Sequence, residues 1–173
     1  MDYPKRKRLR LEYYDYNSPG AYFVTICTRE KRFLFWETSA FDSVGAATSR
    51  PPNAVSLPAG LTAQGKIVED AIQNIEPHYS DVAVDRYVIM PNHIHLLIQT
   101  KQRAADSRPY ELSTVIGHMK RWASAQAGVS LWQRSYHDHV IRNEQDYCDI
   151  WQYIENNPAR WEDDCFYQPE RGV

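Results

Sequence analysis

The segment YVIMPNHIHLLIQT, residues 87–100, restricts the possible folds of this chain more than any other stretch. Two apolar runs meet at Pro91-Asn92, a residue pair that favours a turn. The pattern predicts an antiparallel hairpin of two strands, at 81–90 and 93–100. A hairpin that is almost wholly apolar is typical of the centre of a sheet.

Two histidines interrupt this apolar pattern one residue apart. Side chains on a strand alternate between its faces, so His93 and His95 share one face, and the other face carries Ile94, Leu96 and Ile98. Adjacent imidazoles on a rigid strand are held at a fixed separation, as metal ligands must be. The alternative is a pair of hydrogen-bonded core histidines.

The rest of the chain predicts an α+β fold. Apolar spacing and turn signals predict the following elements in chain order: a strand at 21–28, a helix capped by Thr62 and ended by Pro77, strands at 81–90 and 93–100, a helix at 112–128, a strand at 130–141, and a helix capped by Asn143 and closed by Pro158. The first six elements have the order of the ferredoxin-like split βαβ unit. We therefore expect an antiparallel sheet with two crossover helices on one face and the C-terminal helix near the other.

The length of 173 residues predicts one domain, which we place at 20–161. Residues 162–173 are interpreted as a C-terminal tail. A flexible loop is expected at 42–60, which is rich in Ser, Ala, Gly and Pro and lacks periodicity. No apolar run approaches the roughly 18 residues of a membrane helix, and no signal-peptide core follows the start, so a cytoplasmic protein without membrane contact is expected.

The three cysteines of the chain are Cys27, Cys148 and Cys165. Their odd number and scattered spacing do not fit a disulfide framework or a CxxC metal site.

The first 19 residues are interpreted as a basic arm, although the net charge of the chain is −2. Five basic residues lie close together there: Lys5, Arg6, Lys7, Arg8 and Arg10. They could follow the phosphates of a nucleic acid, and a solvated tail is the alternative.

The last predicted helix offers polar partners for the histidines. Tyr153 and Asn157 are four residues apart and therefore lie on one face of it, at the margin of its apolar stripe. Asn157 offers a neutral carbonyl oxygen as a ligand, and Tyr153 offers a phenol. Taken alone, a tyrosine at such a boundary is more often part of a core.

Three segments in this order, PNHIHLL, LWQRSYHDHVIRN and YIENNPARW, resemble the REP-associated tyrosine transposases. These are single-tyrosine members of the His-hydrophobic-His (HUH) endonucleases, related to the transposases of small single-strand insertion sequences. The resemblance extends from about Gly20 to Trp161, except for 42–60. It implies a ferredoxin-like fold.

The resemblance also implies the chemistry. His93 and His95 match the metal-binding pair, Tyr153 matches the nucleophile, and Asn157 matches the polar ligand four residues later. The family cleaves and rejoins single-stranded DNA, often at palindromic repeats that form hairpins, through a tyrosine joined to the 5′ phosphate. Mg²⁺ or Mn²⁺ suits such a site, and zinc stays open because it also accepts histidine. Monomer and homodimer both stay open, as does attack within one subunit or on a partner's site.

Residues outside the arm that are candidates for DNA contact are Lys120, Arg134, Tyr136, His139 and Arg142. His139 belongs to a second His-x-His pattern with His137, among polar residues, for which a structural role or a substrate contact is expected.

Two alternative functions stay open. The first is a catalytically silent regulator that binds single-stranded DNA on the same fold. The second is a metal-dependent oxygenase or hydrolase, but such β-barrel sites usually add a Glu where this chain has Gln99, and they need more glycines than the seven present.

Overall fold

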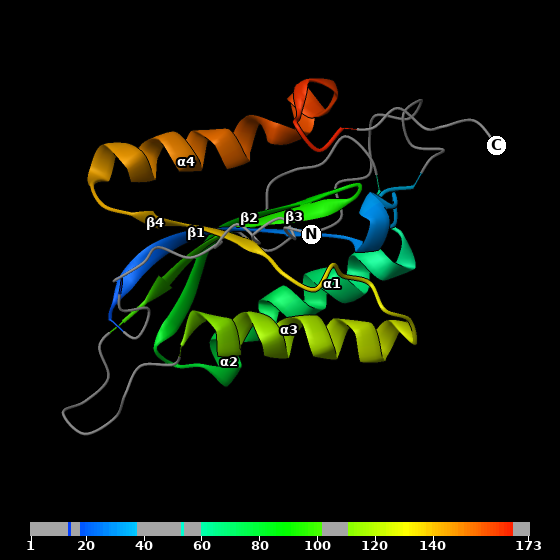
Figure 1. Ribbon diagram of the computed structural model, residues 1–173, viewed down its shortest axis with the longest axis horizontal. Coiled ribbons are helices and arrows are strands. Elements are labelled where there is room, and N and C mark those ends of the chain that lie inside the picture. Colours follow the sequence, from blue (N-terminus) through cyan, green and yellow to red (C-terminus); the bar gives the residue numbers. More distant parts are fainter. Residues whose placement is uncertain (1–13, 15–17, 38–52, 54–59, 102–110, 168–173) are drawn as a thin grey trace, which may run out of the picture.

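The computed structural model describes residues 14, 18–37, 53, 60–101 and 111–167 (Figure 1). The basic residues from Lys5 to Arg10 and nearly all of the 42–60 loop lie outside the described residues.

Four antiparallel strands form one sheet with the order β2-β3-β1-β4. The strands are β1 (Gly20–Cys27), β2 (Val82–Met90), β3 (His93–Thr100) and β4 (His137–Ile141). This is the strand order of a split βαβ fold, in which β1 lies between β3 and β4, its non-consecutive neighbours in the sequence. The open sheet does not provide the β-barrel on which the oxygenase alternative depended.

Helices cover the two faces of the sheet unequally (Figure 1). One face carries α1 (Ala63–Gln73), α2 (Ile75–His78) and α3 (Leu112–Ala127). The other face carries α4 (Glu144–Asn156), which continues into the 3₁₀ helix η3 (Asn157–Asp163); a short 3₁₀ turn, η1 (Arg29–Lys31), follows β1. The expected α+β arrangement, with two crossover helices on one face and the C-terminal helix on the other, is confirmed.

The alternation of side chains separates an apolar face from a site-bearing face. Val24 of β1 and Leu96 of β3 are paired, wholly buried and belong to the core under the crossover helices. Their neighbours Phe23, Thr25 and His95 point to the α4 side, so the imidazoles lie under α4 as the hairpin pattern predicts.

The predicted helix ended by Pro77 is in fact two helices. Thr62 caps α1 as expected, since its side chain accepts a hydrogen bond from the Gly65 amide. Asn74 ends α1, and its side chain donates to the Asp70 carbonyl. Pro77 lies inside α2, within its first turn, where the missing N–H group would have had no helical partner.

The predicted strand at 130–141 is too long, because only 137–141 pairs as a strand. Trp132 forms an isolated bridge with Thr28. The Lys120 ammonium of α3 donates to the carbonyls of residues 133, 134 and 135, at 2.8, 3.2 and 3.5 Å. These carbonyls are thus occupied by a side chain instead of a neighbouring strand.

Among the described residues, no helix combines the length and the apolar character that crossing a bilayer requires.

Candidate active site

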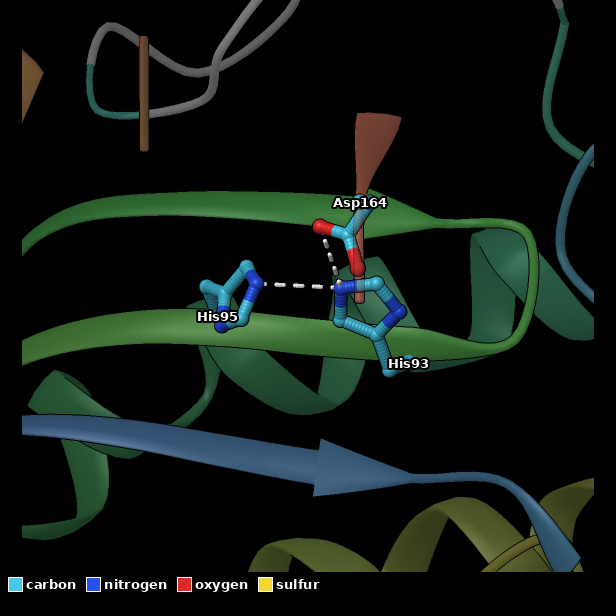
Figure 2. Close-up of side chains that lie close together, drawn as sticks. All are labelled: His93, His95 and Asp164. Carbon is cyan, nitrogen blue, oxygen red and sulfur yellow. Dashed lines mark hydrogen bonds and ion pairs between the residues drawn. The ribbon is translucent and has the colours of Figure 1, made fainter. Parts of the chain in front are cut away.

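His93 and His95 form the centre of a buried polar cluster on the α4 side of the sheet. Figure 2 shows the two rings next to each other together with Asp164. Their side chains are at most 1% exposed, and their Nε2 atoms lie 3.0 Å apart. The rings meet edge to face, with centroids 4.5 Å apart. The separation of one residue on β3 is therefore what brings the two nitrogens together, as the sequence predicts.

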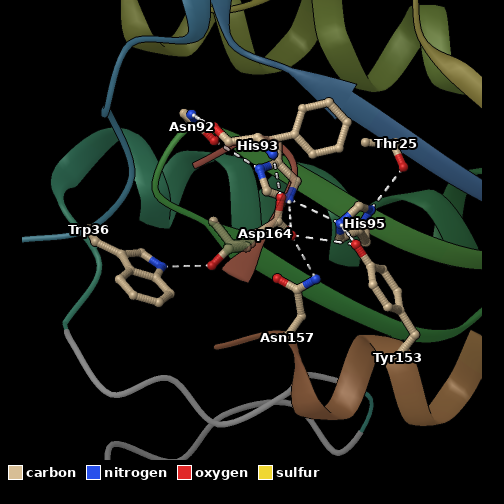
Figure 3. A network of polar contacts seen from close by, with 10 residues as sticks. Thr25, Trp36, Asn92, His93, His95, Tyr153, Asn157 and Asp164 are labelled. Carbon is tan, nitrogen blue, oxygen red and sulfur yellow. Dashed lines mark hydrogen bonds and ion pairs between the residues drawn. The ribbon is translucent and has the colours of Figure 1, made fainter. Parts of the chain in front are cut away.

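Hydrogen bonds on the far side of each ring orient the two imidazoles (Figure 3). Asn92 donates its amide nitrogen to the Phe166 carbonyl at 2.9 Å, which leaves its Oδ1 to accept from His93 Nδ1 at 2.8 Å. Thr25 Oγ1 bonds His95 Nδ1 at 2.8 Å. Because the Asn92 oxygen can only accept, its bond places the proton of His93 on Nδ1 and leaves the Nε2 lone pair directed into the cluster. The Thr25 hydroxyl can also accept from Nδ1, which would give His95 the same tautomer, the arrangement of metal-binding histidines.

Both imidazoles stay neutral at ordinary pH. Burial, reinforced by the nearby Lys31 ammonium, lowers the pKa of His93 from 6.5 to about 3. Burial and the neighbouring His93 hold the pKa of His95 well below its usual value, against the opposing effect of Asp164. Neutral imidazole is the form that binds cations, so protons do not compete with a metal here near neutrality.

Asp164 joins the cluster from the segment after η3, which the sequence pattern assigns to the tail. Its side chain is 1% exposed, and its Oδ2 lies 3.9 Å from His93 Nε2 (Figure 2). One ligand atom from each of His93, His95 and Asp164 lies within 4.8 Å of the others. The aromatic residues around Asp164 are the sequence signal that could have indicated a packed segment instead of a tail. Trp161, which is 6% exposed, and Phe166 pack against His93 and so hold the segment at the site.

Asn157 ends α4 and brings an amide to the same point. It is 5% exposed and donates from Nδ2 to Asp164 Oδ2 at 3.0 Å. Its carbonyl Oδ1 is buried and has no hydrogen-bond partner among the described residues. A buried carbonyl without a partner is costly, so this oxygen is available to a cation. Two neutral nitrogens and a carboxylate that lie close together fit a divalent metal ion, and the Asn157 amide lies beside them, bonded to Asp164.

Tyr153 reaches the cluster from the preceding turn of α4 (Figure 3). Its hydroxyl lies 3.5 Å from His95 Nε2 and donates to Asp164 Oδ2 at 3.4 Å. The ring packs edge to face on Phe23, with centroids 5.8 Å apart, while 43% of the residue stays exposed. Burial and the charge of Asp164 raise the pKa of Tyr153 to about 12, so the phenol is protonated at neutral pH.

A hollow of about 560 Å³ opens beside the tyrosine. Its lining includes Gln152, Tyr153, Asn157, Arg160 and Asp164. The hollow borders Tyr153, Asn157 and Asp164, whereas His93 and His95 stay buried behind them, so a substrate could approach the Tyr153 hydroxyl from the α4 side.

The residues expected to contact DNA are placed in different surroundings. Arg134 and Arg142 are exposed, and Tyr136 is half-buried. His139 is exposed and pairs with Asp146 at 2.9 Å. Because His139 lies opposite Phe23 in the sheet, it shares the face of the site, one strand beyond β1.

Lys120 has a structural role in this arrangement, because its ammonium holds the carbonyls before β4, and burial lowers its pKa. A phosphate contact by any of these side chains stays a prediction, and the arm lies outside the described residues.

Comparisons with known proteins agree with this architecture. No family model matches the chain. The solved structure of a REP-associated tyrosine transposase bound to a REP hairpin superimposes with a TM-score of 0.56 and 21% identity, over 88% of this chain and 74% of that one. The chain therefore has the fold of the REP-associated tyrosine transposases, which confirms at the level of the fold the resemblance that the sequence motifs indicate.

One relative in particular covers nearly the whole chain. A protein of Haemophilus influenzae (strain ATCC 51907 / DSM 11121 / KW20 / Rd), itself uncharacterized, is 31% identical over 183 aligned residues. The alignment spans 94% of this chain and 93% of that protein. The chain belongs to the same family as this H. influenzae protein.

Proposed function

We propose that this protein is a tyrosine transposase that cleaves and rejoins single-stranded DNA. Tyr153 is the nucleophile, and the cluster around His93 and His95 binds a divalent cation, Mg²⁺ or Mn²⁺. Asn157 and Asp164 complete the donor set. The substrate is a strand that carries hairpin-forming palindromic repeats, by analogy with the hairpin held by the structural neighbour.

The observation that carries the proposal is the position of the Tyr153 hydroxyl. It lies within 3.5 Å of both the buried imidazole of His95 and the carboxylate of Asp164, on a helix that also supplies Asn157. A tyrosine kept only for packing has no need to direct its hydroxyl at a buried neutral histidine and a buried carboxylate. The fold shared with a REP-associated transposase supports the same interpretation.

A cation in this cluster would polarise the scissile phosphate and offset the charge that develops on it. Two imidazole nitrogens aligned by Thr25 and Asn92, together with the unpaired Asn157 carbonyl, are the features of this chain that suit it. The protein's own contribution is to hold these donors in place before the DNA arrives.

The covalent step follows from the contacts of Tyr153. The phenol oxygen attacks phosphorus, a bond from Tyr153 to the 5′ phosphate forms, and the bond to the 3′ oxygen breaks. A phenol with a pKa of about 12 does not ionise alone, so the phenol proton leaves as the oxygen attacks and passes to water in the hollow beside Tyr153. The departing 3′ oxygen takes a proton from water. A 3′ hydroxyl can later attack the phosphotyrosine and release Tyr153, so strand joining needs no ATP.

The test is the covalent adduct. Single-stranded DNA labelled on the 3′ side of the cut is mixed with protein and Mg²⁺ or Mn²⁺, and a denaturing gel reports label that migrates with the protein. We expect an adduct from the wild type and none from Tyr153→Phe, which removes one oxygen. Tyr79→Phe is the matched control, because Tyr79 is buried on the other side of the sheet, where its hydroxyl contacts His118.

An adduct that persists in Tyr153→Phe would show that another residue attacks. DNA binding without an adduct in any variant would instead support the silent regulator.

A further inference from the structure

Strand β2 contains an irregularity directly beneath α4. Its register against β3 shifts between Val84 and Arg86, which leaves Asp85 as an extra residue. Consecutive side chains of a regular strand point to opposite faces, but a bulge can turn two neighbours to the same side. Asp85 and Arg86 both contact α4, so the bulge presents an acid and a base side by side to that helix.

The contacts on α4 follow a single stripe of the helix. Tyr147 donates its hydroxyl to Asp85 Oδ2 at 2.7 Å. Arg86 lies over the Trp151 ring at 5.4 Å and donates from Nε to Glu155 Oε2 at 3.0 Å. Tyr147, Trp151 and Glu155 are spaced by four residues and therefore lie above one another on the helix surface.

This stripe restrains the helix in two ways. The contacts at Tyr147 and Glu155 are eight residues apart, about 12 Å along the axis, so they oppose both sliding and rotation of α4. Tyr153 is on a different side of the helix, and its hydroxyl lies on the order of 9 Å from the axis, given a backbone radius of about 2.3 Å. A rotation of about 10° would move that hydroxyl by roughly 1.5 Å, and errors of about 1 Å in a reacting group can cost on the order of 100-fold in rate.

We infer that Asp85 and Arg86 are positioning residues for the nucleophile. Their contacts described above are made with α4, and through these contacts they together set the rotation of α4 and so the approach of Tyr153. The inference rests on the proposed function, because it concerns the reaction of Tyr153 with DNA. It predicts that weakening the bulge contacts slows the covalent step without weakening metal or DNA binding.

The experiment measures the single-turnover rate of adduct formation at saturating DNA and metal, together with the dissociation constants for DNA and for Mn²⁺. For Arg86→Ala we expect the rate to fall about 10- to 100-fold, with both dissociation constants within about twofold of wild type. Tyr147→Phe removes only the hydroxyl that donates a hydrogen bond to Asp85, and it should lower the rate to a lesser extent. Lys66→Ala, which deletes one positive charge from the exposed surface of α1, is the matched control and should leave the rate unchanged.

Rescue separates positioning from a general loss of stability. The exchange Arg86→Glu with Glu155→Arg restores opposite charges across the contact, and we expect it to recover at least tenfold of the rate lost in Arg86→Glu alone. A rate in Arg86→Ala equal to wild type overturns the inference while leaving the proposed function intact. A loss of rate that the charge exchange does not recover overturns it too. A wild-type protein that forms no adduct overturns the proposed function itself.

Discussion

Replacing Asp164 with Asn should sharply weaken the response of this protein to divalent metal. Asp164 is the one carboxylate whose ligand atom lies with those of His93 and His95 in the cluster that the described residues form. Asparagine has nearly the same shape and can still accept the Phe166 amide hydrogen bond, but it removes the negative charge that faces the site. The change keeps the volume of the side chain, but an amide nitrogen in place of Oδ2 also cannot accept the hydrogen bonds of Asn157 and Tyr153.

The size of the effect follows from linkage. A ligand at 100 times its dissociation constant stabilises the folded state by about 2.7 kcal/mol. For a chain of this size, that raises the melting temperature by about 5–10 °C. If the loss of the Asp164 charge weakens metal binding by about 100-fold, the upper end for changes around metal sites, the same metal concentration equals the new dissociation constant. The stabilisation then falls to about 0.4 kcal/mol, a shift of only about 1–2 °C.

The assay is a thermal melt with and without Mn²⁺ or Mg²⁺, supported by calorimetric titration of the metal. Asp163→Asn is the matched control, since Asp163 is the exposed neighbour and its loss changes the net charge equally. A metal-induced rise in melting temperature that is the same in Asp164→Asn as in the wild type would refute the assignment of Asp164 to the site.

Three other perturbations have defined outcomes. Burial lowers the pKa of His93 to about 3 in the folded protein, whereas the pKa in the unfolded chain is near 6.5. The contribution of neutral His93 to stability is therefore complete above pH 6.5 and is lost as the pH falls towards 3. Urea titrations of the metal-free protein should show the free energy of unfolding decline across that range, and the decline should be smaller in His93→Gln. Lys120→Met should lower the free energy of unfolding by about 1–3 kcal/mol in the same titration, because the carbonyls before β4 lose a charged donor. If it also weakens DNA binding more than an equally destabilised core variant does, Lys120 contacts a phosphate as the sequence predicts. Deleting residues 1–10 should reduce the slope of log DNA affinity against log salt concentration, by up to about 0.7 for each phosphate that the basic side chains no longer neutralise. An unchanged slope would indicate that the arm is a solvated tail.

Local patterns in the sequence determined the central features of the sheet. The hairpin around Pro91-Asn92 and the shared face of His93 and His95 depend only on the alternation of a strand, which operates over a few residues. Tyr153 and Asn157 follow from helical spacing in the same way. The split βαβ fold was predictable because the order of elements leaves few ways to cover the sheet.

Other features depended on contacts between segments that are distant in sequence, and only the tertiary structure decided them. Asp164 enters the site because aromatic residues of its segment pack on the sheet, a contact that has no local period to reveal it. The strand before α4 begins only at His137, and Lys120 of α3 holds the carbonyls of the residues that precede it. The bulge at Asp85 faces α4 only when β2, β3 and the helix are in place. The sequence by itself determined which residues could share a face, whereas the free energy of packing distant segments together determined which of those faces became the site.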